Sequence, residues 1–205
     1  MDNYQYHVVD KSSIDFTTLM NNPLTKKTFV DIIKNWYSSG YTYNNIITDN
    51  RQVRYSLTIQ NSIVVAIAIG GPSWNSEPDM YYISHVYTID GCTRLGLCEK
   101  TMYNLVDSYW DYNQNRISNN NNIKLEVEKS NLGAKRCYEK MGFTITDTSD
   151  PTYDWMQLQP DLYRHYYLNL NLKELSIETN KHNNGTTFNI AKAIDMRQKI
   201  IRILE

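Results

Sequence analysis

Residues 80–110 read MYYISHVYTIDGCTRLGLCEKTMYNLVDSYW, and the rest of the chain is organised around this stretch. Aromatic and β-branched residues fill its first part, which predicts a strand. Gly91 and Gly96 predict a turn in its middle. Apolar residues recur at helical steps in its last part, namely Cys98, Met102, Leu105, Val106 and Tyr109. A helix that begins at such a turn directs N–H groups and the positive end of its dipole outward, and this end attracts phosphate.

A P-loop is the first kind of phosphate-binding turn to consider. It has two glycines separated by four residues, followed at once by Lys and Ser or Thr. Gly91 and Gly96 have that separation, but Leu97 and Cys98 follow them, and Lys100-Thr101 comes three positions too late. We therefore exclude nucleotide hydrolysis by a P-loop.

The turn also resembles the pyrophosphate turn of the GNAT superfamily of acyl-CoA-dependent N-acetyltransferases. That pattern is Arg or Gln, two residues, Gly, one residue, then Gly or Ala. Residues 93–98 read TRLGLC, so Thr93 replaces the Arg or Gln and Cys98 replaces the small last residue. Taken alone, this motif fits an ordinary strand-to-helix turn about equally well.

A second stretch, residues 123–143, resembles the next segment of the same family. It reads IKLEVEKSNLGAKRCYEKMGF, and six residues fall on the expected positions: Asn131, Ala134, Tyr138, Lys140, Gly142 and Phe143. Its first residues alternate apolar and charged, as a half-buried strand does. Gly142 is expected to close the following helix in a left-handed conformation. The agreement of both stretches favours membership of the GNAT superfamily.

The resemblance implies an α+β fold. We expect a mixed, mostly antiparallel sheet of about seven strands with splayed fourth and fifth strands, about four flanking helices and an additional C-terminal helix. The predicted domain spans residues 1–172. Residues 173–205 form a C-terminal extension with an amphipathic helix, marked by Ile190, Ile194, Arg197, Ile201 and Leu204, which packs on the same domain or on a second subunit of a homodimer.

Several local patterns predict where strands and helices end. Asn22-Pro23 predicts a helix start, and Gly70-Gly71-Pro72 predicts the end of an apolar strand that begins at Ile63. Two segments compete for the closing strand, Tyr153 to Leu158 and Tyr163 to Leu172. We prefer the second segment, because its leucines alternate more cleanly.

Composition excludes several functional classes. A net charge of -1 provides no basic surface for nucleic acid. No apolar run approaches the length that crosses a bilayer, and the first residues carry no secretory signal, so we expect a cytoplasmic, intracellular protein without membrane partners. Cys92, Cys98 and Cys137 lack a metal-ligand spacing, so we expect neither a disulfide framework nor a metal site.

The resemblance implies that acetyl-CoA binds where the fourth and fifth strands part. The pantetheine arm would pair with the backbone of Val86, Tyr87 and Thr88, as an added strand does. The pyrophosphate would bind the N–H groups of Arg94, Leu95, Gly96, Leu97 and Cys98, with Thr93 at the altered first position. Asn131, Ala134 and Lys140 are carried over as further cofactor-binding positions.

The catalytic roles follow the same resemblance. Tyr138 matches the general acid that protonates the departing thiolate. An N–H group near Tyr87 is expected to stabilise the oxyanion. His85 is a candidate general base because imidazole titrates near neutrality, although histidine-based relatives place theirs nearer Tyr82 and Ser84; a bulge in the strand would reorient His85.

Other residues are also candidates for the general base, and the sequence does not identify the amine acceptor. A structural role for His85 is an equal alternative, and Glu77 and Glu126 are further candidates for the base. The predicted function is transfer of an acetyl group from acetyl-CoA to a primary amine, by direct attack in a ternary complex. The alternative is a catalytically silent acyl-CoA-binding sensor or scaffold. The acceptor is a small molecule or a protein, since polyamines, amino sugars, small amines, protein lysines and N-termini all fit the sequence.

Overall fold

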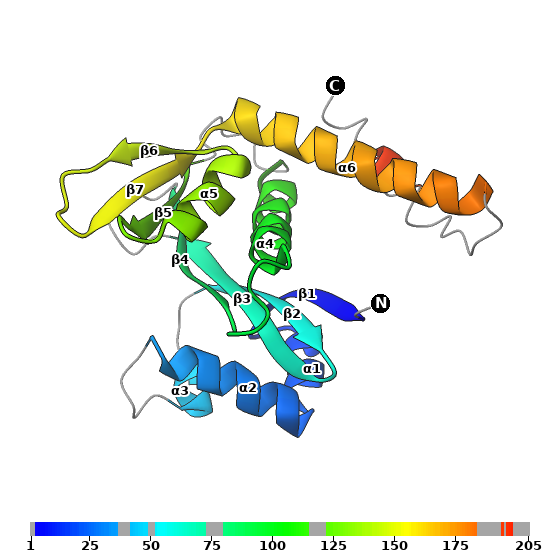
Figure 1. Cartoon of the computed structure of the whole chain (residues 1–205). Helices are drawn as coiled ribbons and strands as arrows, with labels where there is room; N and C mark the ends of the chain where they lie inside the picture. The colour runs from blue at the N-terminus through cyan, green and yellow to red at the C-terminus, as the bar shows by residue number, and fades with distance from the viewer. Residues whose placement is uncertain are drawn as a thin grey trace. The chain divides into compact units, whose positions relative to one another are not determined.

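The computed structural model describes residues 3–36, 42–48, 52–72, 80–114, 122–183, 194 and 196–198. Figure 1 shows the strands and helices of the described residues. In chain order they are β1 (Tyr4–Asp10), α1 (Ile14–Met20), α2 (Pro23–Lys34), α3 (Tyr43–Thr48), β2 (Arg54–Gln60), β3 (Ile63–Pro72), β4 (Met80–Thr88), α4 (Leu97–Gln114), β5 (Asn122–Glu128), α5 (Leu132–Lys140), β6 (Phe143–Asp147), β7 (Tyr153–Leu158) and α6 (Pro160–Asn183).

The strands form one seven-stranded sheet in the order β1-β2-β3-β4-β5-β7-β6. Strands β1 to β4 pair antiparallel with their neighbours, β4 pairs parallel with β5, and β5 pairs antiparallel with β7. This mixed, mostly antiparallel sheet with flanking helices confirms the predicted fold class.

The chain divides into two compact units, one of residues 1–132 and 145–157 and the other of residues 133–144 and 158–205. In the first unit, alternate residues of β2 face opposite sides of the sheet. Tyr55 packs against Phe16 of α1 and Phe29 of α2, with ring centroids 5.7 and 5.3 Å away. On the other side, the hydroxyl of Thr58 lies 2.6 Å from that of Thr101 in α4. Helices α1 and α2 therefore cover one face of the sheet and α4 covers the other.

Two helix starts follow from local capping. The side chain of Asn22 accepts hydrogen bonds from the N–H groups of Leu24 and Thr25, and Pro23 takes the first helical position of α2, which confirms the predicted start. Ser13 caps α1 by accepting a bond of 3.0 Å from Phe16 N–H. Helix α3 has no counterpart among the predictions.

The predicted closing strand over Tyr163 to Leu172 is wrong. Strand β7 is Tyr153–Leu158, and residues 163–172 lie within α6. Pro160 and Asp161 begin this helix, as proline and acidic residues commonly do. The leucine alternation in this segment misled the prediction, because the buried stripe recurs every four residues instead: Tyr163, Tyr167 and Asn171.

Strand β3 also continues through Gly70 and Gly71, where the sequence predicted its end. A Cβ atom at Gly70 would lie 2.6 Å from the ring of Tyr81, and one at Gly71 would lie 2.7 Å from the carbonyl oxygen of Gln52. These glycines therefore admit close neighbours rather than terminate the strand.

In the second unit, Gly142 has φ +96 and joins α5 to β6, which confirms its predicted left-handed conformation. Its carbonyl oxygen accepts a hydrogen bond of 2.9 Å from Gln159 N–H. Of the predicted terminal helix, residues 194 and 196–198 are helical, and the remaining residues lie outside the described part of the chain. No described helix is both long enough and apolar enough to span a membrane.

Candidate functional site

Strands β4 and β5 pair only over their first residues. Their register runs from Met80 opposite Asn122 to Ile83 opposite Leu125. Beyond that point β4 stays paired with β3 up to Thr88, while β5 stays paired with β7. The two strands therefore part after Ile83 and Leu125, as predicted. We call this opening the fork; it is bordered by Ser84–Thr88 on β4 and by Glu126–Glu128 on β5.

A β-bulge lies at the start of the fork. Ile69 of β3 pairs with His85, and the next residue, Gly70, pairs with Ile83, so Ser84 is an extra residue on β4. A bulge shifts the alternation of side chains along its strand. His85 and Tyr87 accordingly face Trp36, which follows α2, with ring centroids 4.5 and 6.0 Å away.

The bulge also sets the hydrogen bonds of His85. Its Nδ1 lies 2.9 Å from Ser84 Oγ, and Ser84 Oγ donates to the carbonyl oxygen of Ile69 over 3.4 Å. In a neutral ring, an accepting hydroxyl oxygen places the hydrogen on Nδ1 and the lone pair on Nε2, whereas a donating hydroxyl places them the other way round. The imidazole is half-buried.

Tyr82, Glu126 and Trp155 form an aromatic and acidic cluster beside the fork. The phenol of Tyr82 donates to Glu126 Oε2 over 3.3 Å, and its ring centroid lies 5.8 Å from that of Trp155. Glu126 and Trp155 are direct cross-strand partners on β5 and β7. Burial raises the pKa of Tyr82, and the Glu126 carboxylate raises it further, so the phenol remains a neutral donor.

The turn before α4 has an unusual backbone. Gly91, Arg94 and Gly96 have φ values of +85, +65 and +74. Left-handed φ is uncommon for a long side chain such as that of Arg94, and such residues often mark functional backbone. A Cβ atom at Gly96 would meet nothing within 4 Å, so the space beside this backbone is open.

The first residue of α4 is buried against the sheet, whereas the N–H groups at the start of the helix point outward. Leu97 is buried and packs with Val65 and Ala66 of β3. Lys100 N–H donates to Gly96 carbonyl oxygen over 3.1 Å, which closes the first helical turn. The N–H groups before Lys100 point out of the helix start by helix geometry. Such a turn suits an anion, since successive N–H groups and the helix dipole face the same space.

The structure brings the predicted residues of the first unit into two adjoining segments. Ser84, His85, Val86, Tyr87 and Thr88 border the fork. Residues 93–98, all predicted to bind cofactor, form the turn and the helix start that follow. Asn131 comes directly before α5, and its N–H donates to Glu128 carbonyl oxygen over 2.9 Å.

The other predicted residues lie on α5, in the second unit: Ala134, Tyr138 and Lys140. Tyr138 is 6% exposed, and its ring centroid lies 6.1 Å from that of Phe143. Glu77, a candidate base, lies outside the described residues.

Sequence reasoning missed Tyr82 and Trp155 as side chains of the site. Each lies in a strand that contains other aromatic residues, but β5 separates the two strands, and only the pairing of all three strands brings the rings together. Among the described residues, no group of three His, Cys, Asp or Glu side chains has the arrangement of a metal site.

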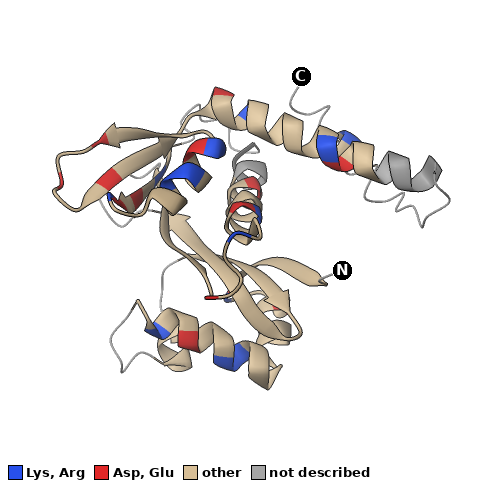
Figure 2. Cartoon of the chain, viewed as in Figure 1, with Lys and Arg blue, Asp and Glu red and all other residues tan. Residues whose placement is uncertain are grey.

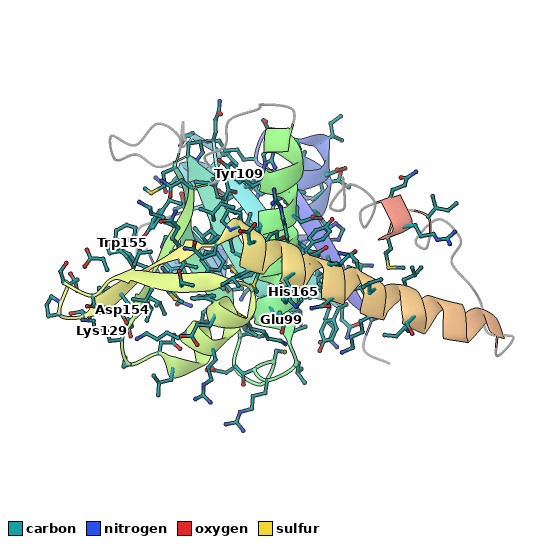
Figure 3. All side chains as sticks on the ribbon, turned by 90° about the horizontal axis from the view of Figure 1, so that it is seen from above. Glu99, Tyr109, Lys129, Asp154, Trp155 and His165 are labelled. Atoms are coloured by element: carbon teal, nitrogen blue, oxygen red, sulfur yellow. The ribbon has the colours of Figure 1, made fainter. Side chains whose placement is uncertain are left out.

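The charged residues around the fork lie on its β5 side. Strands β3 and β4 contain no Lys, Arg, Asp or Glu, so the centre of the sheet is uncharged in Figure 2. Toward β7, Figure 3 shows Lys129 and Asp154 close together, with Trp155 next along the strand. Lys129 Nζ lies 3.7 Å from Asp154 Oδ1.

Comparison with known proteins identifies a matching protein family. Residues 21–143 match the model of the acetyltransferase (GNAT) family. No match is found among curated proteins.

Three solved structures illustrate the likeness in fold. A chain of the NatC complex bound to Gag peptide and CoA is 17% identical, with a TM-score of 0.52 over 77% of this chain and 98% of that chain. The yncA protein of Salmonella typhimurium, solved with its cofactor acetyl-CoA, is 18% identical, with a TM-score of 0.47 over 76% and 93%. An IAA acetyltransferase from Bacillus cereus is 11% identical, with a TM-score of 0.49 over 76% and 99%.

Proposed function

The chain belongs to the acetyltransferase (GNAT) family, and on that premise we propose that it transfers an acetyl group from acetyl-CoA to a primary amine within a ternary complex. The observation that carries the proposal is the fork. Its β4 border lies in one segment, residues 84–98, with a histidine and with a helix start whose N–H groups suit an anion.

The strand edge suits the pantetheine arm of the coenzyme. This arm carries amide groups, and an extended chain of amides adds to an open sheet edge through backbone hydrogen bonds. Val86, Tyr87 and Thr88 form the edge of β4 beyond its last pair with β5. We assign these three residues to the pantetheine arm.

The turn suits the diphosphate. Residues 93–98 supply backbone N–H groups, which any residue type provides, so Thr93 and Cys98 can replace the family's usual residues without loss of donors. The open space beside Gly96 lets phosphate oxygens approach the backbone. Arg94, exposed in the same turn, adds a positive charge. Asn131, Ala134 and Lys140 are further cofactor-binding positions by resemblance.

The chemistry needs a proton acceptor for the amine. When bound, acetyl-CoA supplies an acetyl thioester as the electrophile. A protonated amine has no lone pair for attack, so a base must take its proton. In this proposal Ser84 Oγ accepts the ring hydrogen on Nδ1, and His85 Nε2 is that base. Ser84 is thus a positioning residue.

Two other groups complete the proposed transfer. The N–H group of Tyr87 stabilises negative charge on the acetyl oxygen as the amine attacks. Tyr138 donates its phenolic proton to the thiolate as the carbon–sulfur bond breaks, and the resulting phenolate regains a proton as the acetylated nitrogen loses its second one. The role of Tyr138 rests on its match to the family's second motif.

The test is release of free coenzyme thiol from acetyl-CoA in the presence of a panel of primary amines. We expect amine-dependent release with acetylation of the amine. Thermal denaturation with and without acetyl-CoA separates the outcomes, since ligand at ~100 times its dissociation constant stabilises the folded state by about 2.7 kcal/mol. Stabilisation without thiol release for any amine would instead identify a silent acyl-CoA binder.

A further inference from the structure

The position of Glu126 links it to the fork. Leu125 is the last residue of β5 that pairs with β4, so Glu126 is the first residue beyond it. Across the opening, the corresponding residues of β4 are Ser84 and His85. Lys124 and Glu126 occupy the face of β5 opposite to the buried Ile123 and Leu125. This is the face to which Tyr82, the register partner of Lys124, also belongs.

The surroundings of Glu126 suit an ammonium group. The carboxylate is exposed, and its one hydrogen bond among the described residues comes from the Tyr82 phenol. This bond orients the carboxylate without neutralising it. No ion pair involves Glu126 in the described part of the chain, although Lys124 lies two residues away on the same face. The rings of Tyr82 and Trp155, 5.8 Å apart, can each attract a cation by their faces.

The same surroundings also favour one kind of chemical group for the part of the acceptor that carries the amine. The aromatic rings offer apolar area, whereas a sugar bearing several hydroxyl groups requires many hydrogen-bonding partners. The exposed face of β5 carries one lysine and two glutamates, Lys124, Glu126 and Glu128. This balance suits one positive charge better than several.

Building on the proposed function, we infer that Glu126, Tyr82 and Trp155 bind the acceptor, and that the acceptor is a primary monoamine on an aromatic or alkyl stem. The carboxylate holds the ammonium group at the fork, and the rings contact the stem. His85, on the other border of the fork, then takes the proton.

The experiment compares 2-phenylethylamine, hexylamine and glucosamine as acceptors for the wild type, Glu126→Gln and a matched control, Asp31→Asn. Asp31 is an exposed carboxylate on α2 that pairs with Lys27, so its substitution removes the same charge elsewhere. We expect kcat/KM to be at least about tenfold higher for the two monoamines than for glucosamine. Glu126→Gln should raise KM for 2-phenylethylamine about tenfold with kcat nearly unchanged, because it removes binding rather than chemistry. Asp31→Asn should leave both constants unchanged.

Two results would overturn the inference while leaving the proposed function intact: glucosamine as good an acceptor as the monoamines, or Glu126→Gln indistinguishable from Asp31→Asn. If no amine is acetylated although acetyl-CoA binds, the proposed function fails. Calorimetric binding of 2-phenylethylamine to the CoA-saturated protein then judges the subsite alone. Binding that Glu126→Gln leaves unchanged would reject it, and binding weakened about tenfold would support it.

Discussion

The Nδ1 atom of His85 lies 2.9 Å from the hydroxyl oxygen of Ser84, at the one position where β4 has a residue more than β3. The bulge and this hydrogen bond act together. The bulge turns the imidazole toward Trp36 and away from α4, and in the proposal the serine hydroxyl accepts the hydrogen of Nδ1. A single irregularity of the strand therefore orients the proposed base.

His85→Gln should reduce kcat by about 100-fold, because general-base catalysis typically contributes this much or more. The variant should keep its affinity for acetyl-CoA, since His85 is not among the proposed coenzyme contacts. The activity of the wild type should fall at acid pH as the imidazole becomes protonated, and the variant should lose this dependence. Steady-state rates over pH measure both effects; unchanged turnover would exclude His85 as the base.

Ser84→Ala should reduce kcat by about tenfold, the value of roughly one charge-assisted hydrogen bond. Ser84→Thr, which keeps a hydroxyl group, should restore much of the activity. If Ser84 had only a structural role, Ser84→Ala would change the free energy of unfolding and leave the pH dependence of the rate unchanged. If Ser84→Ala and Ser84→Thr were equally active, the assignment of the ring hydrogen to Nδ1 would lose its support.

Gly96→Ala should weaken acetyl-CoA binding about tenfold, because the new methyl group enters the open space beside the proposed diphosphate site. Gly91→Ala is the matched control. Gly91 also has positive φ, +85, and open surroundings, but it precedes the proposed site. Each substitution should lower the free energy of unfolding by about 1 kcal/mol through backbone strain. Calorimetric titration checks the affinities, and equal affinity in both variants would contradict the site.

Gly142→Ala should destabilise the protein by about 2–4 kcal/mol, more than either substitution above. The conformation at φ +96 disfavours alanine, and its Cβ atom would lie 2.8 Å from Tyr163 N and 3.0 Å from Leu162 C. Urea denaturation of Gly142→Ala beside Gly91→Ala measures the difference. Equal urea midpoints for the two variants would contradict this prediction, because they would show that α6 moves away from the new methyl group without a loss of stability.

Lys129→Met should lower the free energy of unfolding by about 1–3 kcal/mol. The side chain of Asp154 is only 5% exposed, so the substitution would remove the Lys129 ammonium group from beside a buried carboxylate. Lys27→Met is the control, because Lys27 and Asp31 form an exposed pair that contributes less than about 1 kcal/mol. Chemical denaturation of the two variants should therefore give clearly different midpoints, and similar midpoints would contradict the assigned role of Lys129.

Alkaline pH should destabilise the protein through Tyr81. Burial raises the pKa of Tyr81 above that of an unfolded tyrosine, about 10. Stability is therefore intact below pH ~10 and decreases above it, by at most about 1.4 kcal/mol per pH unit for this residue. The Tyr81 hydroxyl is buried and has no hydrogen-bond partner among the described residues. Tyr81→Phe should accordingly be near neutral at pH ~7 and reduce the alkaline loss, as denaturant midpoints across this range would reveal.

The sequence predicts those parts of the fold and site that depend on local geometry. Gly142 is predicted to be left-handed and Gly96 to lie in a turn, because short-range sterics favour glycine where φ is positive. The closing strand could not be predicted in the same way. Leu168, Leu170 and Leu172 alternate as in a strand, but tertiary burial of a stripe that includes Tyr163 and Tyr167 makes the segment helical. The alternation of apolar residues in a segment therefore does not by itself determine which of its residues become buried.

For a similar reason, local sequence patterns could not predict the bulge at Ser84 or the cluster around Glu126. A bulge is defined by the register of β4 against β3, and Tyr82 meets Glu126 and Trp155 only through the pairing of three strands. The sequence identified His85 and Glu126 as candidates for the base. Strand register distinguishes their proposed roles, with His85 beside Ser84 and Glu126 beside the aromatic rings.

The most direct test of the central claim is a crystal structure of the protein with bound CoA. We predict the diphosphate on the N–H groups of residues 94–98, the pantetheine arm along Val86 to Thr88, and the hydroxyl of Tyr138 within about 3.5 Å of the sulfur, as hydrogen bonds to sulfur require. A diphosphate bound elsewhere, or a Tyr138 hydroxyl directed away from the sulfur, would contradict the account.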